Sequence, residues 1–155
     1  MAKQCDHTSV GMLVWRDDKL LLIERKRPPF GFAPPAGHVD GDASFEGAAR
    51  RELREEVGLG AEDIQFLAEG RKNNPCRRKG GTWHDWKIYK VEATGEVAGS
   101  EDETKRTDFY SKDELSALAG KTENYLRGKI KQDDWEASPG LEPVWYEWLK
   151  ELKII

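Results

Sequence analysis

Three glutamates in residues 51–59, RELREEVGL, have the spacing of metal ligands. If this segment is helical, Glu52, Glu55 and Glu56 are related as i, i+3 and i+4, so their carboxylates share one face. Like charges at this spacing cost roughly a few tenths of a kcal/mol per pair on an exposed helix. The pattern therefore indicates a bound cation, and clustered oxygen ligands suit Mg²⁺ or Mn²⁺, which also bind substrate phosphates.

The same charges allow a second interpretation, a solvent-exposed helix carrying ion pairs. Glu46 with Arg50, and Arg51 with Glu55, are opposite charges separated by four residues. Such pairs stabilise helices that bind nothing. The charge pattern alone does not decide between the two interpretations, but the order of the residue types does.

From residue 37 to 59 the sequence GHVDGDASFEGAARRELREEVGL resembles the Nudix box, the signature of the Nudix hydrolases. The resemblance implies cleavage of a diphosphate linkage in a nucleoside diphosphate derivative: a nucleoside triphosphate, a nucleotide sugar, ADP-ribose or a dinucleoside polyphosphate. The matching positions are Gly37, Arg51, Glu52, Glu55, Glu56, Gly58 and Leu59.

The resemblance also implies a role for each residue of the box. Glu52, Glu55 and Glu56 would coordinate Mg²⁺ (or Mn²⁺), and Gly37 would contribute its backbone carbonyl. Glu52 and Glu55 are also the candidate catalytic groups of the box, because a carboxylate can orient a water or take its proton. Arg51 would hold a glutamate in position, a task for which its rigid fork is suited.

One position departs from the box. The family usually has a glutamate six residues after the first glycine, where this chain has Ala43. Asp40, Asp42 and Glu46 are nearby in the sequence, but none occupies that position. Because the family's glutamate there is an auxiliary metal or water contact, the departure affects the expected number of metal ions more than the activity.

The family commonly adds a catalytic or metal-binding glutamate from a distant loop. The acidic segment SEDETK offers Glu101, Asp102 and Glu103, and the resemblance favours Glu103. The alternative is an acidic loop that is merely solvated.

Candidate substrate contacts are aromatic and basic side chains near expected loops. An aromatic ring that stacks a base typically contributes ~1–3 kcal/mol, whereas most aromatics at such positions belong to the core. The candidates are Phe30, Phe32, Trp83 and Trp86 for stacking, and Arg77, Arg78 and Lys79 for an outer phosphate.

Length and charge fit a single domain spanning residues 1–155. With 37% apolar and 35% charged residues the chain is an ordinary, highly charged globular protein. Its net charge of −4 gives no electrostatic case for a nucleic acid polymer or an anionic membrane. No apolar run could span a bilayer and the N-terminus lacks a signal-peptide core, so we expect a cytoplasmic protein that binds a small nucleotide. A homodimer is left open.

The two cysteines, Cys5 and Cys76, are far apart in the sequence and form no disulfide framework. Together with His7 and His84 they could be imagined as a zinc site. Their spacing matches no recognised zinc pattern, so the sequence does not predict one.

Hydrophobic patterns predict the elements that position these residues. Residues 8–15 and 19–23 are expected to pair as a β-hairpin, followed by a proline-rich loop at 25–37. The box helix should begin after Ser44, a good N-cap, and end at Val57 with Gly58 as a left-handed C-cap. Further strands are expected at 64–70, 83–93 and 108–111, and helices at 112–119 and in the C-terminal segment from 139.

Strands and helices in this order indicate an α/β domain. The Nudix resemblance implies an α-β-α sandwich with a mixed β-sheet, and thus a divalent-metal-dependent pyrophosphohydrolase. The alternative is a non-hydrolysing Nudix-like module that binds a nucleotide metabolite as a sensor. Loss of the box glutamates would favour that module, and all three central ones are present.

Overall fold

Two four-stranded sheets lie at the centre of the fold in this computed structural model, which describes residues 3–155. One sheet has the order β5-β1-β7-β6, in which β1 and β7 run parallel and the other pairings are antiparallel. Its strands are β1 (Thr8–Leu13), β5 (Ala36–Gly37), β6 (Gly60–Lys72) and β7 (His84–Thr94). In the other sheet β3 pairs with β2, β4 and β8. Its strands are β2 (Trp15–Arg16), β3 (Lys19–Arg25), β4 (Phe32–Ala33) and β8 (Thr104–Tyr110).

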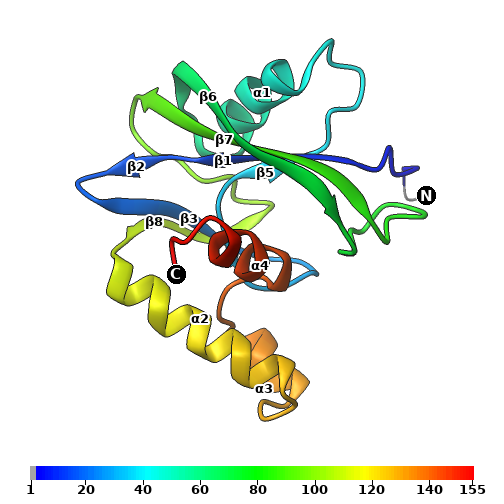
Figure 1. Cartoon of the computed structure of the whole chain (residues 1–155), viewed down its shortest axis with the longest axis vertical. Helices are drawn as coiled ribbons and strands as arrows, with labels where there is room; N and C mark the ends of the chain where they lie inside the picture. Colours follow the sequence, from blue (N-terminus) through cyan, green and yellow to red (C-terminus); the bar gives the residue numbers. More distant parts are fainter. Residues whose placement is uncertain (1–2) are drawn as a thin grey trace.

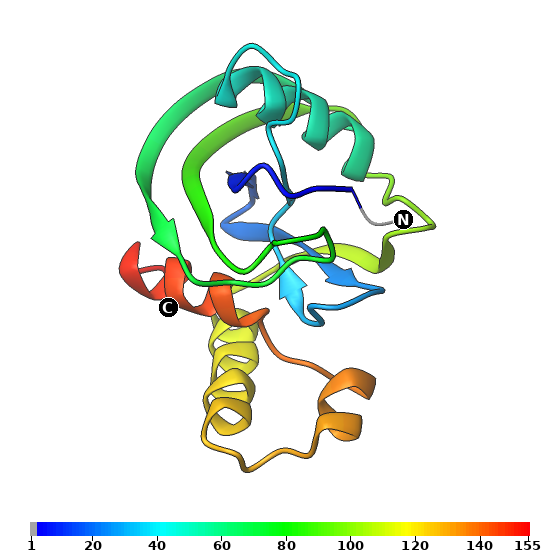
Figure 2. The same ribbon diagram turned by 90° about the vertical axis from the view of Figure 1, so that its right-hand side faces the viewer.

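Helices cover the sheets from two sides (Figure 1). Helix α1 lies across the strongly curved β6 and β7 on one side, and the remaining helices gather on the other (Figure 2). The helices are α1 (Phe45–Val57), α2 (Lys112–Leu126), α3 (Gln132–Ala137) and α4 (Pro143–Glu151). The predicted mixed α/β sandwich is therefore confirmed. Within residues 3–155 no helix is both long and apolar enough to cross a membrane.

Side chains that alternate along β1 contribute to two separate hydrophobic cores. Val10 and Met12 pack with the buried face of α1, whereas Leu13 packs on the opposite side with the aromatic residues of α4. Because side chains alternate across a strand, one strand can seal both layers. The core on the α1 side also contains Ala48, Ala49, Leu53 and Val57, the helix face expected from the sequence.

The box helix has the predicted boundaries. The Ser44 hydroxyl accepts a hydrogen bond from the Gly47 backbone N–H at 3.0 Å, which caps the first turn. The helix ends at Val57, and Gly58 takes a left-handed conformation with φ of 72°. Both ends are therefore set by residues within the segment itself.

The predicted hairpin of residues 8–15 and 19–23 is wrong in its pairing. Of the first expected strand, only its last residue, Trp15, pairs with β3 as part of the short β2. The two are joined by a turn at Asp17 and Asp18, both with positive φ. β1 instead pairs with the distant β7, in a register that sets Thr8 opposite Asp85. The two segments separate because β1 belongs to one sheet and β3 to the other.

Several other elements differ in extent from the prediction. β6 and β8 begin four residues earlier than expected, and α2 continues to Leu126. Helix α3 was not predicted; it has only six residues and no side-chain cap. The proline-rich segment contains the two-residue strands β4 and β5.

Gly11 of β1 is required by the packing of α4. A Cβ at this position would overlap the indole ring of Trp145 and lie 3.0 Å from Cδ1 of Ile88. Overpacking of this kind costs about 1–3 kcal/mol. We expect Gly11→Ala to lower the free energy of unfolding by that amount, measured by urea denaturation. Gly41→Ala is the matched control, because a Cβ there meets no atom within 4 Å; equal stability of the two variants would contradict the packing described.

Candidate active site

A cleft of about 490 Å³ brings the box together with loops distant in the sequence. The segment just before α1 and α1 itself line this cleft, together with residues 74–78 and with Ser100, Asp102 and Glu103. Among its lining residues are Gly37, Arg51, Glu52, Glu55, Glu56, Arg77, Arg78, Trp86 and Glu103. Most of the residues expected to be functional thus line one cavity.

Gly37 and Glu52 are in direct contact. A Cβ on Gly37 would overlap the Glu52 carboxylate, so only glycine allows the carboxylate to lie against this stretch of backbone. Glu52 is largely buried, with 14% of its side chain exposed, and burial raises the pKa of its carboxyl group. The contact places a carboxylate beside the backbone of β5, as a shared cation site would require.

Arg51 joins the box helix to the loop that precedes it. Its Nη1 donates to Glu52 Oε1 at 2.7 Å and to Glu55 Oε2 at 3.2 Å. Its Nε donates to Asp42 Oδ2 at 2.7 Å, and its Nη2 to the His38 carbonyl at 2.8 Å. Because each of its three nitrogens donates to a protein oxygen, Arg51 orients the acidic cluster and has no free fork for substrate.

Glu56 and Glu55 occupy different environments one residue apart. The Glu56 carboxylate accepts a hydrogen bond from the Ala36 backbone N–H at 3.1 Å, and burial, assisted by the charge of Glu52, raises its pKa to about 8. The Glu55 side chain is 61% exposed. A partly buried carboxylate beside other carboxylates is costly unless a cation joins them.

The donors of this cluster fit Mg²⁺ or Mn²⁺. They are carboxylate and carbonyl oxygens, the hard ligands these ions prefer. The contact between Gly37 and Glu52, and the raised pKa of Glu56, are the two observations of this structure that agree with a cation there. Gly37, Glu52, Glu55 and Glu56 are the residues that would hold it.

The acidic loop contributes two carboxylates to the same cleft. Glu103 and Asp102 line the cavity, whereas Glu101 does not. The Ser100 backbone N–H donates to the Glu56 carbonyl at 2.9 Å, which ties this loop to the end of α1. Across the cavity, Arg77 Nη2 lies 3.7 Å from Glu103 Oε1.

Arg78 is paired rather than free. Its Nη2 donates to Asp40 Oδ2 at 3.0 Å, and this hydrogen bond lowers the pKa of Asp40 to about 2. Arg77, with 43% of its side chain exposed, is the more available of the two for a phosphate.

Comparison with known proteins agrees with this geometry. The NUDIX domain family matches residues 6–132, which include the box helix and every cleft loop named so far. The chain belongs to the Nudix family. It is therefore a Nudix pyrophosphohydrolase of the MutT-like type.

Individual relatives support the same assignment. The chain is 31% identical over 126 residues to the ADP-ribose pyrophosphatase of Methanocaldococcus jannaschii, a match that covers 79% of this chain and 72% of the relative. It superposes on the MutT NUDIX hydrolase from Burkholderia pseudomallei with a TM-score of 0.61 and 26% identity, covering 69% of this chain and 84% of the other. A NUDIX hydrolase from Nitrosomonas europaea has the same fold, with a TM-score of 0.62, 22% identity and coverage of 79% and 90%.

The aromatic candidates do not form a stacking platform in this Nudix cleft. Phe32 is 7% exposed and packs in the core against Tyr110, outside the cleft lining. Trp86 reaches the cleft but is 4% exposed, and its Nε1 donates to Asn74 Oδ1 at 3.0 Å. Phe32 is therefore left out of the proposed substrate contacts, and Trp86, although it lines the cleft, is almost fully buried.

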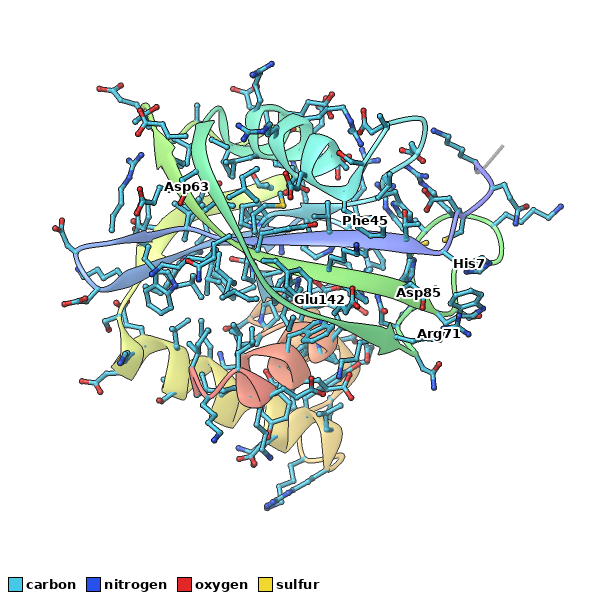
Figure 3. The ribbon with its side chains drawn as sticks, turned by 45° about the horizontal axis from the view of Figure 1, so that its top comes forward. His7, Phe45, Asp63, Arg71, Asp85 and Glu142 are labelled. Atoms are coloured by element: carbon cyan, nitrogen blue, oxygen red, sulfur yellow. The ribbon has the colours of Figure 1, made fainter. Side chains whose placement is uncertain are left out.

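Trp83 directly precedes the first residue of β7 and does not line the cleft. Its ring stacks on His7 with centroids 3.9 Å apart, and the Arg71 guanidinium lies 4.0 Å from the ring centroid. His7, Arg71 and the neighbouring Asp85 gather at one end of the sheet (Figure 3). Both faces of the indole are thus occupied, and Phe30 lines a different cavity.

Three residues that line the cleft were not predicted from the sequence. Glu142 is buried at the N-terminus of α4 beneath the sheet (Figure 3), and burial raises its pKa. Trp145, one turn later, forms part of the cleft floor. His38 follows Gly37 directly, but no pattern in the sequence marks it as functional. The first two come from a C-terminal helix that looks from its sequence like ordinary core.

Proposed function

We propose that this Nudix hydrolase cleaves the diphosphate linkage of a small nucleoside diphosphate derivative with the help of Mg²⁺ or Mn²⁺, and that ADP-ribose is the first substrate to test. The arrangement of Gly37, Glu52, Glu55 and Glu56 around one wall of the cleft carries the proposal. ADP-ribose is placed first because the curated relative from Methanocaldococcus jannaschii is an ADP-ribose pyrophosphatase.

The residues of the cleft would have separate roles in this reaction. Glu52 and Glu56 would hold the cation with the Gly37 carbonyl, and Arg51 fixes their orientation. A divalent ion bound there supplies charge neutralisation of the phosphates and a more acidic water. Arg77 is exposed in the cleft and can bind a phosphate oxygen, whereas Glu103 faces the box and can orient or deprotonate the attacking water.

A substrate screen tests this function. ADP-ribose, nucleotide sugars, nucleoside triphosphates and dinucleoside polyphosphates would be incubated with the protein and either Mg²⁺ or Mn²⁺, and the products detected by a phosphatase-coupled phosphate assay. We expect turnover of one class, and none in excess EDTA. Tight nucleotide binding without hydrolysis of any of them would favour the sensor module instead.

Ala43 precedes the box helix and is exposed. Its acidic neighbours are engaged elsewhere, because Asp42 binds Arg51 and Asp40 binds Arg78. Water therefore remains to complete any outer coordination at this position. We expect Ala43→Glu to change the affinity for Mg²⁺ or the preference between Mg²⁺ and Mn²⁺ more than it changes turnover. Activity titrated against each ion measures this, and a very large gain in turnover would show instead that the native site is catalytically impaired.

A further inference from the structure

Four thiol and imidazole groups converge beside the cleft, outside the acidic box. They are Cys5, His38, Cys76 and His84, and one ligand atom from each lies within 4.8 Å of all the others. Cys5 and His84 are buried and the other two are half-buried. They come from four segments: the residues before β1, the residue after β5, the loop between β6 and β7, and the first residue of β7.

The distances are those of a tetrahedral metal site. Cys5 Sγ lies 3.8 Å from Cys76 Sγ, 3.6 Å from His38 Nε2 and 3.4 Å from His84 Nε2. A tetrahedral Zn²⁺ with Zn–S bonds of about 2.3 Å and Zn–N bonds of about 2.05 Å holds two sulfurs about 3.8 Å apart, and a sulfur and a nitrogen about 3.6 Å apart. A disulfide requires a sulfur separation of about 2.05 Å. The two sulfurs are therefore placed to share a metal ion.

A backbone N–H donates a hydrogen bond to each of the two sulfurs. The His7 N–H donates to Cys5 Sγ at 3.3 Å, and the Arg78 N–H donates to Cys76 Sγ at 3.4 Å. In each case the donor is two residues after the cysteine. Hydrogen bonds to a thiolate favour its charged form, which is the form that binds metal.

Backbone hydrogen bonds fix the position of the Cys76 side chain. The Cys76 N–H donates to the Gly81 carbonyl at 2.8 Å, and the Cys5 N–H donates to the Lys79 carbonyl at 2.9 Å. A Cβ at Gly81 would overlap Cys76 Sγ, so a glycine is needed for the sulfur to occupy its place. The two cysteines, 71 residues apart in the sequence, are thus pinned side by side by backbone hydrogen bonds.

We propose that Cys5, His38, Cys76 and His84 bind one Zn²⁺ ion that fastens the loop between β6 and β7 to the start of the box. Two thiolates and two imidazoles select zinc, whereas the carboxylate cluster of the box selects Mg²⁺ or Mn²⁺. With four protein ligands the site is closed and structural. The zinc therefore fixes Arg77 and Arg78, which follow Cys76 directly, against the cleft. This proposal does not depend on the proposed substrate.

The sequence did not predict this site because the spacing of its residues matches no recognised zinc pattern. Cys5, Cys76 and His84 do meet, but the fourth group is His38 and not His7. His7 is occupied elsewhere, with its ring stacked on Trp83 and its Nδ1 3.0 Å from the Trp83 carbonyl. His7 therefore provides a histidine control close to the site.

Metal analysis of the purified protein is the first test. The protein is prepared with a non-thiol reductant and no added metal, and its zinc content is measured by mass spectrometry. We expect one zinc per chain in the wild type, in His7→Gln and in Glu56→Gln, and little or none in Cys76→Ser and His38→Gln. Zinc in Cys76→Ser equal to that of the wild type, or a zinc-free wild type that binds none on titration, would overturn the proposal.

Cobalt substitution tests the ligand set on the wild type, and so does not depend on whether a variant folds. We expect Co²⁺ to produce the intense visible bands of a tetrahedral ion and a thiolate charge-transfer band, and Zn²⁺ to displace it with a dissociation constant of about 10 nM or tighter. A spectrum without thiolate charge transfer would overturn the proposal. A Cys5–Cys76 disulfide in the protein prepared under reductant would overturn it too.

Hydrogen exchange tests what the ion does. Removing zinc with a chelator that spares Mg²⁺ should speed amide exchange in residues 73–82, while the amides of α1 keep their protection. Unchanged exchange in that loop after complete removal of zinc would overturn its role as a fastening.

Discussion

Replacing Glu56 with glutamine is expected to lower turnover by about a hundredfold or more, and Glu55→Gln to do the same. Glutamine keeps the shape of each side chain but removes the charge that a divalent ion requires. In the Glu56→Gln variant the side-chain amide oxygen can still accept the hydrogen bond that the Ala36 backbone N–H donates to Glu56 Oε2. The loss should therefore appear in turnover and in the Mg²⁺ concentration needed for half-maximal activity, both obtained by steady-state kinetics.

Glu46→Gln is the matched control for this pair. Glu46 is an exposed glutamate in the first turn of the same helix and does not line the cleft. Its activity should stay within about twofold of the wild type. Wild-type activity in Glu56→Gln, or full activity in EDTA, would defeat the metal-dependent mechanism.

The pH dependence of stability distinguishes loss of a ligand from loss of the fold. In the metal-free protein the pKa of Glu56 is raised to about 8, so the unfolded chain gives up this proton more readily than the folded one. The carboxyl group then costs the fold increasing free energy as pH rises from its ordinary pKa near 4.5 to about 8. Glu56→Gln should consequently become more stable than the metal-free wild type across this range, as followed by thermal unfolding, and added Mg²⁺ should stabilise only the wild type.

Glu103→Gln is expected to lower turnover at least about tenfold while changing KM no more than a few-fold. Glu103 lines the same cleft as the box glutamates, and an in-line attack on phosphorus there needs a base or an orienting group. Its loop is held in place by Lys26, whose backbone N–H donates to the Glu103 carbonyl at 3.0 Å. The substitution should therefore affect the transition state more than the binding of substrate.

The neighbouring carboxylates serve as the comparison. Asp102 also lines the cleft, whereas Glu101 does not, so we expect Asp102→Asn to have a smaller effect and Glu101→Gln none. Kinetics of the three variants measured side by side decide the assignment. If Asp102→Asn is the damaging change, the assignment is off by one residue. If all three behave like the wild type, the base lies within the box and Glu52 becomes the first candidate.

Features set by neighbouring residues could be predicted from the sequence, and features set by distant ones could not. The box helix was correct at both ends because Ser44 and Gly58 cap it locally. The partner of β1 was wrong because the parallel pairing of Thr8 with Asp85 depends on the whole sheet. Arg51 was expected to hold a glutamate, and its forked contacts to Glu52 and Glu55 are within one helical turn.

The same distinction explains the candidate site residues. Phe32 and Trp86 were placed near loops by sequence, but their burial follows from how α2 and α4 cover the sheet. The convergence of Cys5 with His38 and His84 spans 33 and 79 residues of sequence, and no local pattern encodes it. Helix α3 was missed because six residues without a side-chain cap leave little periodic signal.

The placement of Trp145 over Gly11 makes the order of synthesis matter. Trp145, which lines the cleft, comes from a helix that begins at Pro143, whereas the box with its candidate metal ligands ends at residue 59. While the chain is still being translated, the box helix can form on β1 with the opposite face of that strand uncovered. The cleft gains the residues that α4 contributes only after residue 145 has emerged from the ribosome. We therefore expect the box helix to form before the cleft has its full lining.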